Sequence, residues 1–107
     1  MRYKIDYSKE AEDDLNELDS SQKNQVRKAI LKVSENPLPK NEGGYGTPLG
    51  NKHGKNLTGL CKIKLLKLGI RVVYKLVRTD SVMKIIVIAA RADYEVYEIA
   101  AKRIEHE

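Results

Sequence analysis

Three cationic side chains in the middle of the chain have the spacing of a phosphate-binding surface. Lys62 and Lys64 alternate with apolar residues, which is the pattern of a strand with one polar face. If the following turn is centred on residues 67–68, Lys64 lies directly opposite Arg71, and Lys62 lies further along the same face. Like charges that face each other across two strands repel, so these cations are poor stabilisers and are suited to binding phosphate. The alternative is a solvent-exposed face whose lysines extend into water.

The positive charge of the chain is concentrated in its middle third. The whole chain has a formal charge of +5 at pH 7. Residues 1–36 contribute −1, residues 37–78 contribute +8 and residues 79–107 contribute −2. A local excess of this size favours a polyanionic partner, of which RNA and DNA are the plainest candidates. The alternative is lysine that serves solubility alone.

Other residue types that carry chemistry are sparse. The two histidines, His53 and His106, have no metal-ligand spacing, so we expect no metal site. Strand alternation directs Cys61 to the apolar face, where a free cysteine is usually an inert core residue. The glycine-rich segment 43–56 lacks the spacing of a nucleotide-binding P-loop. The sequence therefore predicts neither a cofactor nor a metal.

The length and composition indicate one small globular domain, residues 1–107. A single cysteine cannot form an internal disulfide, and residues 1–10 have no apolar leader, so a cytoplasmic location is expected. The longest apolar run, residues 85–90, is far shorter than the roughly 20 residues of a membrane-spanning helix. We therefore expect no membrane-spanning segment.

The first third of the chain predicts a strand followed by a helical hairpin. Alternation over residues 3–7 predicts the strand. Ser8 is a suitable cap for a short amphipathic helix, and residues 19–21 offer the cap of a second helix that stops near Asn36. The second helix must end there because Pro37 and Pro39 follow.

The rest of the chain predicts a long connection, three strands and a last helix. The segment Pro37 to Asn56 has five glycines and no periodicity, so we interpret it as a loop. Three strands with short turns follow, and helical spacing then returns, over residues 57–66, 70–77, 82–90 and 93–104 respectively. The predicted class is α+β with the order β-α-α-β-β-β-α: an antiparallel sheet flanked by the N-terminal helical hairpin and the C-terminal helix.

Two segments of the chain resemble a known family. KIKLLKLGIRVVYKL (residues 62–76) and IAARADYEVYEIAAKRI (residues 88–104) are similar to the RelE/ParE toxin superfamily, and to RelE-type ribosome-dependent mRNA endonucleases in particular. The resemblance extends from Tyr3 to Ile104 and implies the small RelE-like fold. It also implies a set of working residues, all of which are present here: Lys62, Lys64, Arg71, Arg91 and Tyr97.

The resemblance gives each of these residues a role in cleaving RNA through its own 2′-hydroxyl. It implies that Tyr97 is the base, that Arg91 is the acid or stabilises the leaving group, and that the three strand cations bind the phosphate. Periodicity alone favours a core position for Tyr97 on its helix, and the resemblance reverses that interpretation. A basic loop residue also contacts RNA in RelE, and Lys52 or Lys55 is the candidate here.

The implied protein is the toxin of a type II toxin–antitoxin pair that cuts mRNA in the ribosomal A site. Its implied partners are a cognate antitoxin and the ribosome. Two alternatives stay open: a ParE-like inhibitor of DNA gyrase, and a non-catalytic module that binds RNA or the antitoxin. The chain departs from the family at Cys61, where an aromatic residue is common, and in its longer glycine-rich loop.

Overall fold

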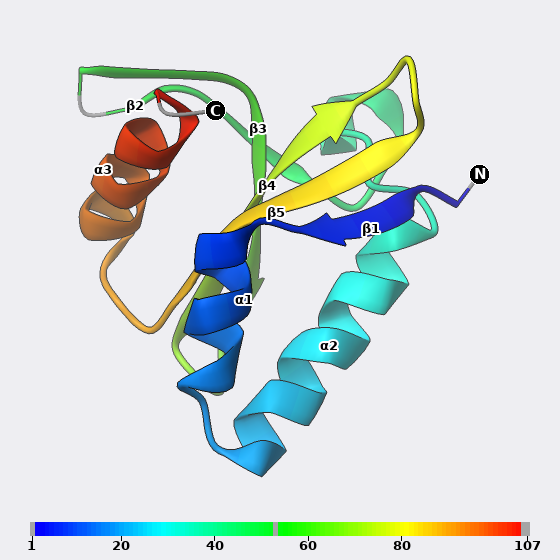
Figure 1. Cartoon of the computed structure of the whole chain (residues 1–107). Coiled ribbons are helices and arrows are strands. Elements are labelled where there is room, and N and C mark those ends of the chain that lie inside the picture. Colours follow the sequence, from blue (N-terminus) through cyan, green and yellow to red (C-terminus); the bar gives the residue numbers. More distant parts are fainter. Residues whose placement is uncertain (1, 53, 106–107) are drawn as a thin grey trace.

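The computed structural model describes residues 2–52 and 54–105, without the side chains of residues 51, 52 and 55. One five-stranded sheet has the strand order β1-β5-β4-β3-β2. The pair α1 and α2 covers one face of this sheet, and α3 covers the other (Figure 1). The elements in chain order are β1 Lys4–Tyr7, α1 Lys9–Asn16, α2 Ser20–Ser34, the 3₁₀ helix η1 Lys40–Glu42, β2 Thr47–Lys52, β3 Lys55–Leu65, β4 Ile70–Val77, β5 Val82–Ala89 and α3 Asp93–Ile104.

The N-terminal helical hairpin is confirmed, including both caps. The Ser8 side chain accepts a hydrogen bond from the Ala11 N–H, 3.1 Å away. Asp19 begins α2 with a reciprocal capping box, in which its side chain accepts from the Gln22 N–H and the Gln22 side chain accepts from the Asp19 N–H. The second helix ends at Ser34, just before the two prolines.

The prediction that residues 37–56 form one long loop is wrong. The segment contains η1 and the whole of β2, which pairs antiparallel with β3. The pairing shifts register between Pro48 and Gly50, and this irregularity explains why the segment shows no alternation. Gly46 is required by close packing, because a Cβ atom there would lie 2.1 Å from the Tyr74 hydroxyl. That hydroxyl donates a 2.7 Å hydrogen bond to the Pro37 carbonyl and so holds the segment against the sheet.

The sheet is also not wholly antiparallel. β1 pairs parallel with β5, with Lys4 opposite Val82. The three strands β3, β4 and β5 are antiparallel, as the short turns between them predicted. The predicted register of the β3–β4 hairpin is confirmed, because Lys64 lies opposite Arg71. The predicted α+β class is confirmed, with one strand added to the predicted order.

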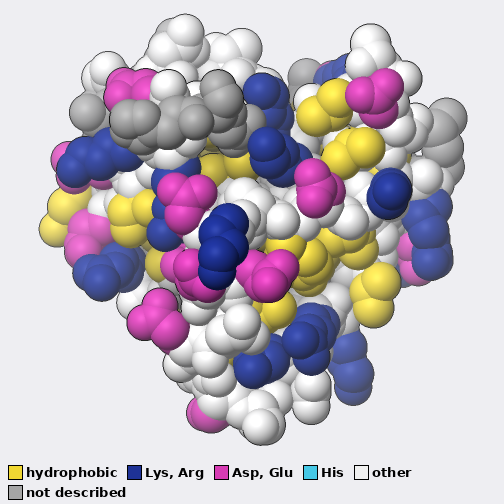
Figure 2. Space-filling model, viewed as in Figure 1, with side chains coloured by type: hydrophobic (Ala, Val, Ile, Leu, Met, Phe, Trp, Pro, Cys, Tyr) yellow, Lys and Arg dark blue, Asp and Glu magenta, His cyan; other side chains and the backbone are white. Residues whose placement is uncertain are grey.

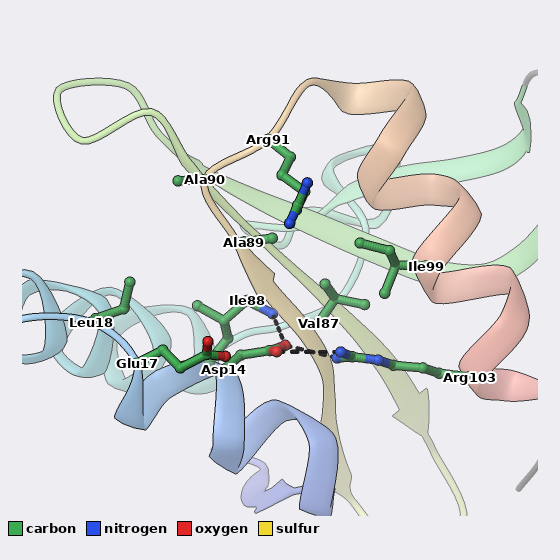
Figure 3. Close-up of a pocket in the computed structure, with 10 residues that line it drawn as sticks. All are labelled: Asp14, Glu17, Leu18, Val87, Ile88, Ala89, Ala90, Arg91, Ile99 and Arg103. Atoms are coloured by element: carbon green, nitrogen blue, oxygen red, sulfur yellow. Dashed lines mark hydrogen bonds and ion pairs between the residues drawn. The ribbon is translucent and has the colours of Figure 1, made fainter.

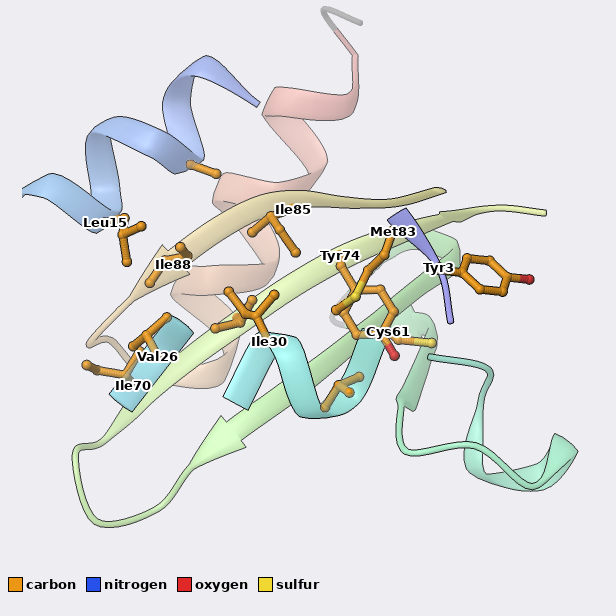
Figure 4. Packing of buried hydrophobic residues seen from close by; sticks show 13 residues of the cluster. Tyr3, Leu15, Val26, Ile30, Cys61, Ile70, Tyr74, Met83, Ile85 and Ile88 are labelled. Atoms are coloured by element: carbon orange, nitrogen blue, oxygen red, sulfur yellow. The ribbon is translucent and has the colours of Figure 1, made fainter. Parts of the chain in front are cut away.

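Two apolar clusters hold the layers together. The first lies between the sheet and the α1–α2 hairpin and includes Ile30, Cys61 and Tyr74, which Figure 4 shows packed together. The buried position of Cys61, 2% exposed, is as predicted. The second lies beneath α3 and includes Val73 and Tyr97. Within the described residues, none of the helices has the length and apolar character needed to cross a membrane.

Candidate phosphate-binding and catalytic site

Strand alternation and the docking of α3 bring Lys62 to Tyr97. Lys62 lies on the face of β3 that α3 covers, and its side chain is only 17% exposed. Its Nζ donates a 2.8 Å hydrogen bond to the Tyr97 Oη and lies 5.5 Å from the centroid of the Tyr97 ring. Tyr97 itself is 3% exposed, since the second apolar cluster surrounds its ring. The site thus joins a phenol and an ammonium at the edge of the core.

Arg71 lies on β4 opposite Lys64 and is held at three points. Its Nε donates to the Asp93 carboxylate, with which it also forms an ion pair. Its Nη1 donates to the main-chain carbonyls of Arg91, at 2.5 Å, and of Gly69, at 3.4 Å. Arg71 therefore connects the β3–β4 turn to the connection between β5 and α3.

Asp93 is the member of the site that the sequence reasoning missed. Its carboxylate pairs with Arg71 and lies 3.5 Å from the Lys62 Nζ. Asp93 and Tyr97 are four residues apart on α3 and therefore share a helix face, which is the signal that could have found it. An acidic residue in a first helical turn is otherwise explained by the helix dipole alone.

The charges of the site reinforce one another. Partial burial by itself disfavours the Asp93 carboxylate, but the hydrogen bond from Arg71 and the nearby cations outweigh burial and lower the pKa of Asp93. Burial likewise opposes the charged form of Lys62, but the hydrogen bond to Tyr97 and the charge of Asp93 raise its pKa. Lys62 is therefore an ammonium and Asp93 a carboxylate at neutral pH.

The remaining predicted residues lie at different distances from this centre. Lys64 is exposed, is paired in register with Arg71, and adds to the positive potential at Asp93. The Arg91 main chain joins the site through its carbonyl, but its side chain is 60% exposed and pairs with Glu95, 3.4 Å away. The side chains of Lys52 and Lys55 lie outside the described residues, so their predicted RNA contact stays a prediction.

The Arg91 guanidinium is directed to a pocket on the other flank of α3. This pocket has a volume of about 360 Å³ and lies between α1, the end of β5 and α3, where Ile99 and Arg103 contribute to its wall. Figure 3 shows the Arg91 side chain extending into it. Tyr97 and Ile99 are separated by about 200° around the helix axis, so the pocket and Tyr97 lie on different flanks of α3. In this arrangement the guanidinium of Arg91 faces away from Tyr97.

The arrangement is suited to binding an anion. Lys62, Lys64 and Arg71 present two ammonium groups and a guanidinium along one side of the α3 N-terminus, and Tyr97 supplies a hydroxyl beside them. Within residues 2–52 and 54–105, no three His, Cys, Asp or Glu side chains form a group that could hold a metal ion. On the face that Figure 2 shows, basic and acidic side chains are intermixed, so the cations there do not form one continuous basic surface.

The fold is shared with solved structures of RelE toxins. A variant of the E. coli toxin RelE with two arginine-to-alanine substitutions, in the free state, has 28% sequence identity and a TM-score of 0.77, with 97% of this chain and 99% of that chain covered. The resemblance to the RelE-type toxin superfamily is confirmed. No protein-family model matches this RelE-like chain, and no curated protein matches it.

Two further RelE-like structures contain an antitoxin. The same E. coli RelE variant in complex with a RelB antitoxin peptide has 27% identity and a TM-score of 0.70, with 96% and 98% of the two chains covered. The toxin–antitoxin complex RelBE2 from Mycobacterium tuberculosis has 21% identity and a TM-score of 0.68, with 87% and 95% covered, and shows the shared fold. The similarity to these RelE structures supports the interpretation of this protein as a toxin of the type II toxin–antitoxin class.

Proposed function

We propose that this protein is the toxin of a type II toxin–antitoxin pair and that it cleaves mRNA in the ribosomal A site. The observation that carries the proposal is the 2.8 Å hydrogen bond from the Lys62 Nζ to the Tyr97 Oη, with Arg71 paired to the same Asp93 carboxylate as Lys62. This cluster combines a group that can exchange a proton with cations that can bind a phosphate. Its residues are those that the resemblance to RelE-type endonucleases implies.

The proposed reaction is attack of the RNA 2′-hydroxyl on the adjacent phosphorus. Tyr97 acts as a phenolate, whose negative charge Lys62 stabilises, and takes the 2′ proton to become the phenol. Arg71 and Lys64 stabilise the charge that accumulates on the phosphorane oxygens. The bond to the 5′-oxygen then breaks, and Arg91 either donates a proton to the leaving oxygen or stabilises its charge until water protonates it, so that a 2′,3′-cyclic phosphate and a 5′-hydroxyl result.

Arg91 has to change its side-chain position for its proposed role. In the free chain its guanidinium pairs with Glu95 and extends into the pocket beside α3. This pair is exposed, and exposed ion pairs contribute little to stability, so rotation of Arg91 toward the leaving group costs little. The negative phosphate supplies the attraction that the rotation needs.

Two macromolecular partners belong to the proposal. The site holds few acid and base groups, so the correct orientation of the RNA has to come from the ribosome, which places the protein in the cytoplasm. The second partner is a cognate antitoxin. Solved complexes of similar toxins with their antitoxins support this partner.

The proposal is tested with programmed ribosomes. Purified, antitoxin-free protein is added to ribosomes that hold a defined mRNA and, separately, to the same mRNA alone, and the cleavage ends are mapped by primer extension. We expect cuts within the A-site codon that require ribosomes and that leave a 2′,3′-cyclic phosphate. Folded protein that cuts neither sample contradicts the proposal and favours a gyrase inhibitor or a non-catalytic binder.

A further inference from the structure

An internal carboxylate occupies the space between the two best-positioned cations. One oxygen of Asp93 accepts from the Arg71 Nε, and the other lies 3.5 Å from the Lys62 Nζ. The two carboxylate oxygens bind a guanidinium on one side and an ammonium on the other. The two non-bridging oxygens of a phosphodiester can bind the same two groups in the same way. A phosphate and the Asp93 carboxylate therefore cannot bind these two cations in full at the same time.

Both cations keep a second attachment that does not involve Asp93. Lys62 donates to the Tyr97 hydroxyl, and Arg71 donates to the carbonyls of Arg91 and Gly69. None of these acceptors is a carboxylate, so they position the two cations independently of Asp93. If the carboxylate moves away, two oriented cations remain around one empty position.

The carboxylate is the member of the site that is best able to move. The Asp93 side chain is 35% exposed, whereas those of Lys62 and Arg71 are 17% exposed. Asp93 is in the first turn of α3, where the Ala92 side chain forms no cap hydrogen bond, so a new side-chain rotamer breaks no cap. Rotation of Asp93 toward solvent opens the cation pair while the helix stays in place.

We propose that Asp93 is a built-in competitor of the RNA phosphate: it occupies the phosphate position between Lys62 and Arg71 in the free protein and is displaced when RNA binds. This inference rests on the proposed function for the identity of the anion. The competition weakens the binding of phosphate groups to the free protein. Binding is then strongest where a second surface, such as the ribosome, holds the RNA in place.

The test is a binding titration that involves no cleavage. The parent, Asp93→Asn, Asp93→Ser and Glu98→Gln are titrated with inorganic phosphate, followed by the amide chemical shifts of β3 and β4, and with a short 2′-O-methyl RNA, followed by fluorescence anisotropy. Glu98→Gln is the matched control, because it removes one negative charge from an exposed position of the same helix. Circular dichroism melting curves check that each variant is folded.

We expect both Asp93 variants to bind phosphate and RNA about three- to tenfold more tightly than the parent, and Glu98→Gln to stay within about twofold of it. Asp93 variants that bind no more tightly than Glu98→Gln overturn the inference, since Asp93 then only positions the cations. The serine variant decides the question if the asparagine variant does not fold. A parent that fails to cut ribosome-bound mRNA contradicts the proposed function and leaves this titration interpretable.

Discussion

Tyr97 belongs to the apolar core and to the polar site at the same time. Its ring is part of the cluster beneath α3, while its hydroxyl accepts the hydrogen bond from Lys62. The core position that periodicity favours and the role that the resemblance implies are therefore compatible. Because the ring is closely packed in the core, the position of its hydroxyl oxygen is restricted. A side chain on an exposed loop is not restricted in this way.

The hydroxyl of Tyr97 can be tested separately from its ring. Tyr97→Phe keeps the packing and removes the oxygen, so we expect cleavage of ribosome-bound mRNA to fall by about 100-fold or more, the usual loss for a general base. Tyr94→Phe is the control, because Tyr94 is an exposed tyrosine of the same helix. Single-turnover cleavage rates compare the two. Equal rates in both variants mean that Tyr97 is not the base.

The pH dependence of stability reports the ion pairs of Asp93. Because its folded-state pKa is lowered from 3.8, the stabilisation is fully present above that unfolded-state value and is lost as the pH falls through the folded-state value. We expect the difference in free energy of unfolding between the parent and Asp93→Asn to be constant from about pH 5 to pH 8 and to shrink below about pH 4. Urea unfolding of both proteins across this range measures it. A difference that grows in acid contradicts the assignment.

The cationic residues of the site could be predicted from the sequence, but their contacts with a counter-ion could not. Strand alternation determines which face Lys62, Lys64 and Arg71 occupy, and the short turn determines which of them are opposite each other. The contact of Asp93 with these cations depends on how α3 docks on the sheet, and no local pattern specifies that docking. The direction of the Arg91 side chain depends on the same docking.

At the level of elements, local sequence patterns located most helices and strands correctly, but no sequence pattern indicated the pairing of strands that are far apart in the chain. Caps, prolines and alternation located both N-terminal helices, the strand β4 and the helix α3, with the bounds of β4 and α3 as predicted. The strand β2 was missed because a proline, a glycine and a register shift interrupt its pattern. The parallel pairing of β1 could not be predicted, since its partner β5 lies more than 70 residues away in the sequence.

The position of α3, which carries Tyr97 and Asp93, depends on a polar connection to α1 and β5. Arg103 donates to Asp14 at 2.7 Å, and Asp14 also accepts from the Ile88 N–H (Figure 3). Arg103 donates as well to the Ile86 carbonyl at 2.8 Å. The Arg103 and Asp14 side chains are 20% and 15% exposed. One ion pair therefore fastens helices from both faces of the sheet to the end of β5.

Removal of one charge from this connection leaves the other charge partly buried. We expect Asp14→Asn to lower the free energy of unfolding by about 2 to 3 kcal/mol, measured by urea unfolding. Asp13→Asn is the matched control, because its ion pair with Lys9 is exposed and should contribute little. If the two variants are equally stable, the connection does not hold α3 in place.

At the level of the whole molecule, net charge and local charge make different predictions about RNA binding. The chain carries +5 overall, and its surface mixes both signs on the face seen in Figure 2. If the net charge alone attracts RNA, the loss of any exposed lysine weakens binding equally. If phosphate binds at the α3 N-terminus, only cations near that position matter. The dependence of RNA affinity on salt separates these cases, because each phosphate contact releases counter-ions.

Lys64 and Lys28 give a matched pair for this measurement. Both are exposed; Lys64 lies beside Arg71 on the face that α3 covers, and Lys28 lies on α2 across the sheet. We expect Lys64→Met to reduce the slope of log affinity for a 2′-O-methyl RNA against log salt by about 0.7, and Lys28→Met to leave the slope unchanged. Fluorescence anisotropy at several salt concentrations gives both slopes. Equal slopes for the two variants mean that RNA is attracted by the net charge and that the strand cations form no phosphate site.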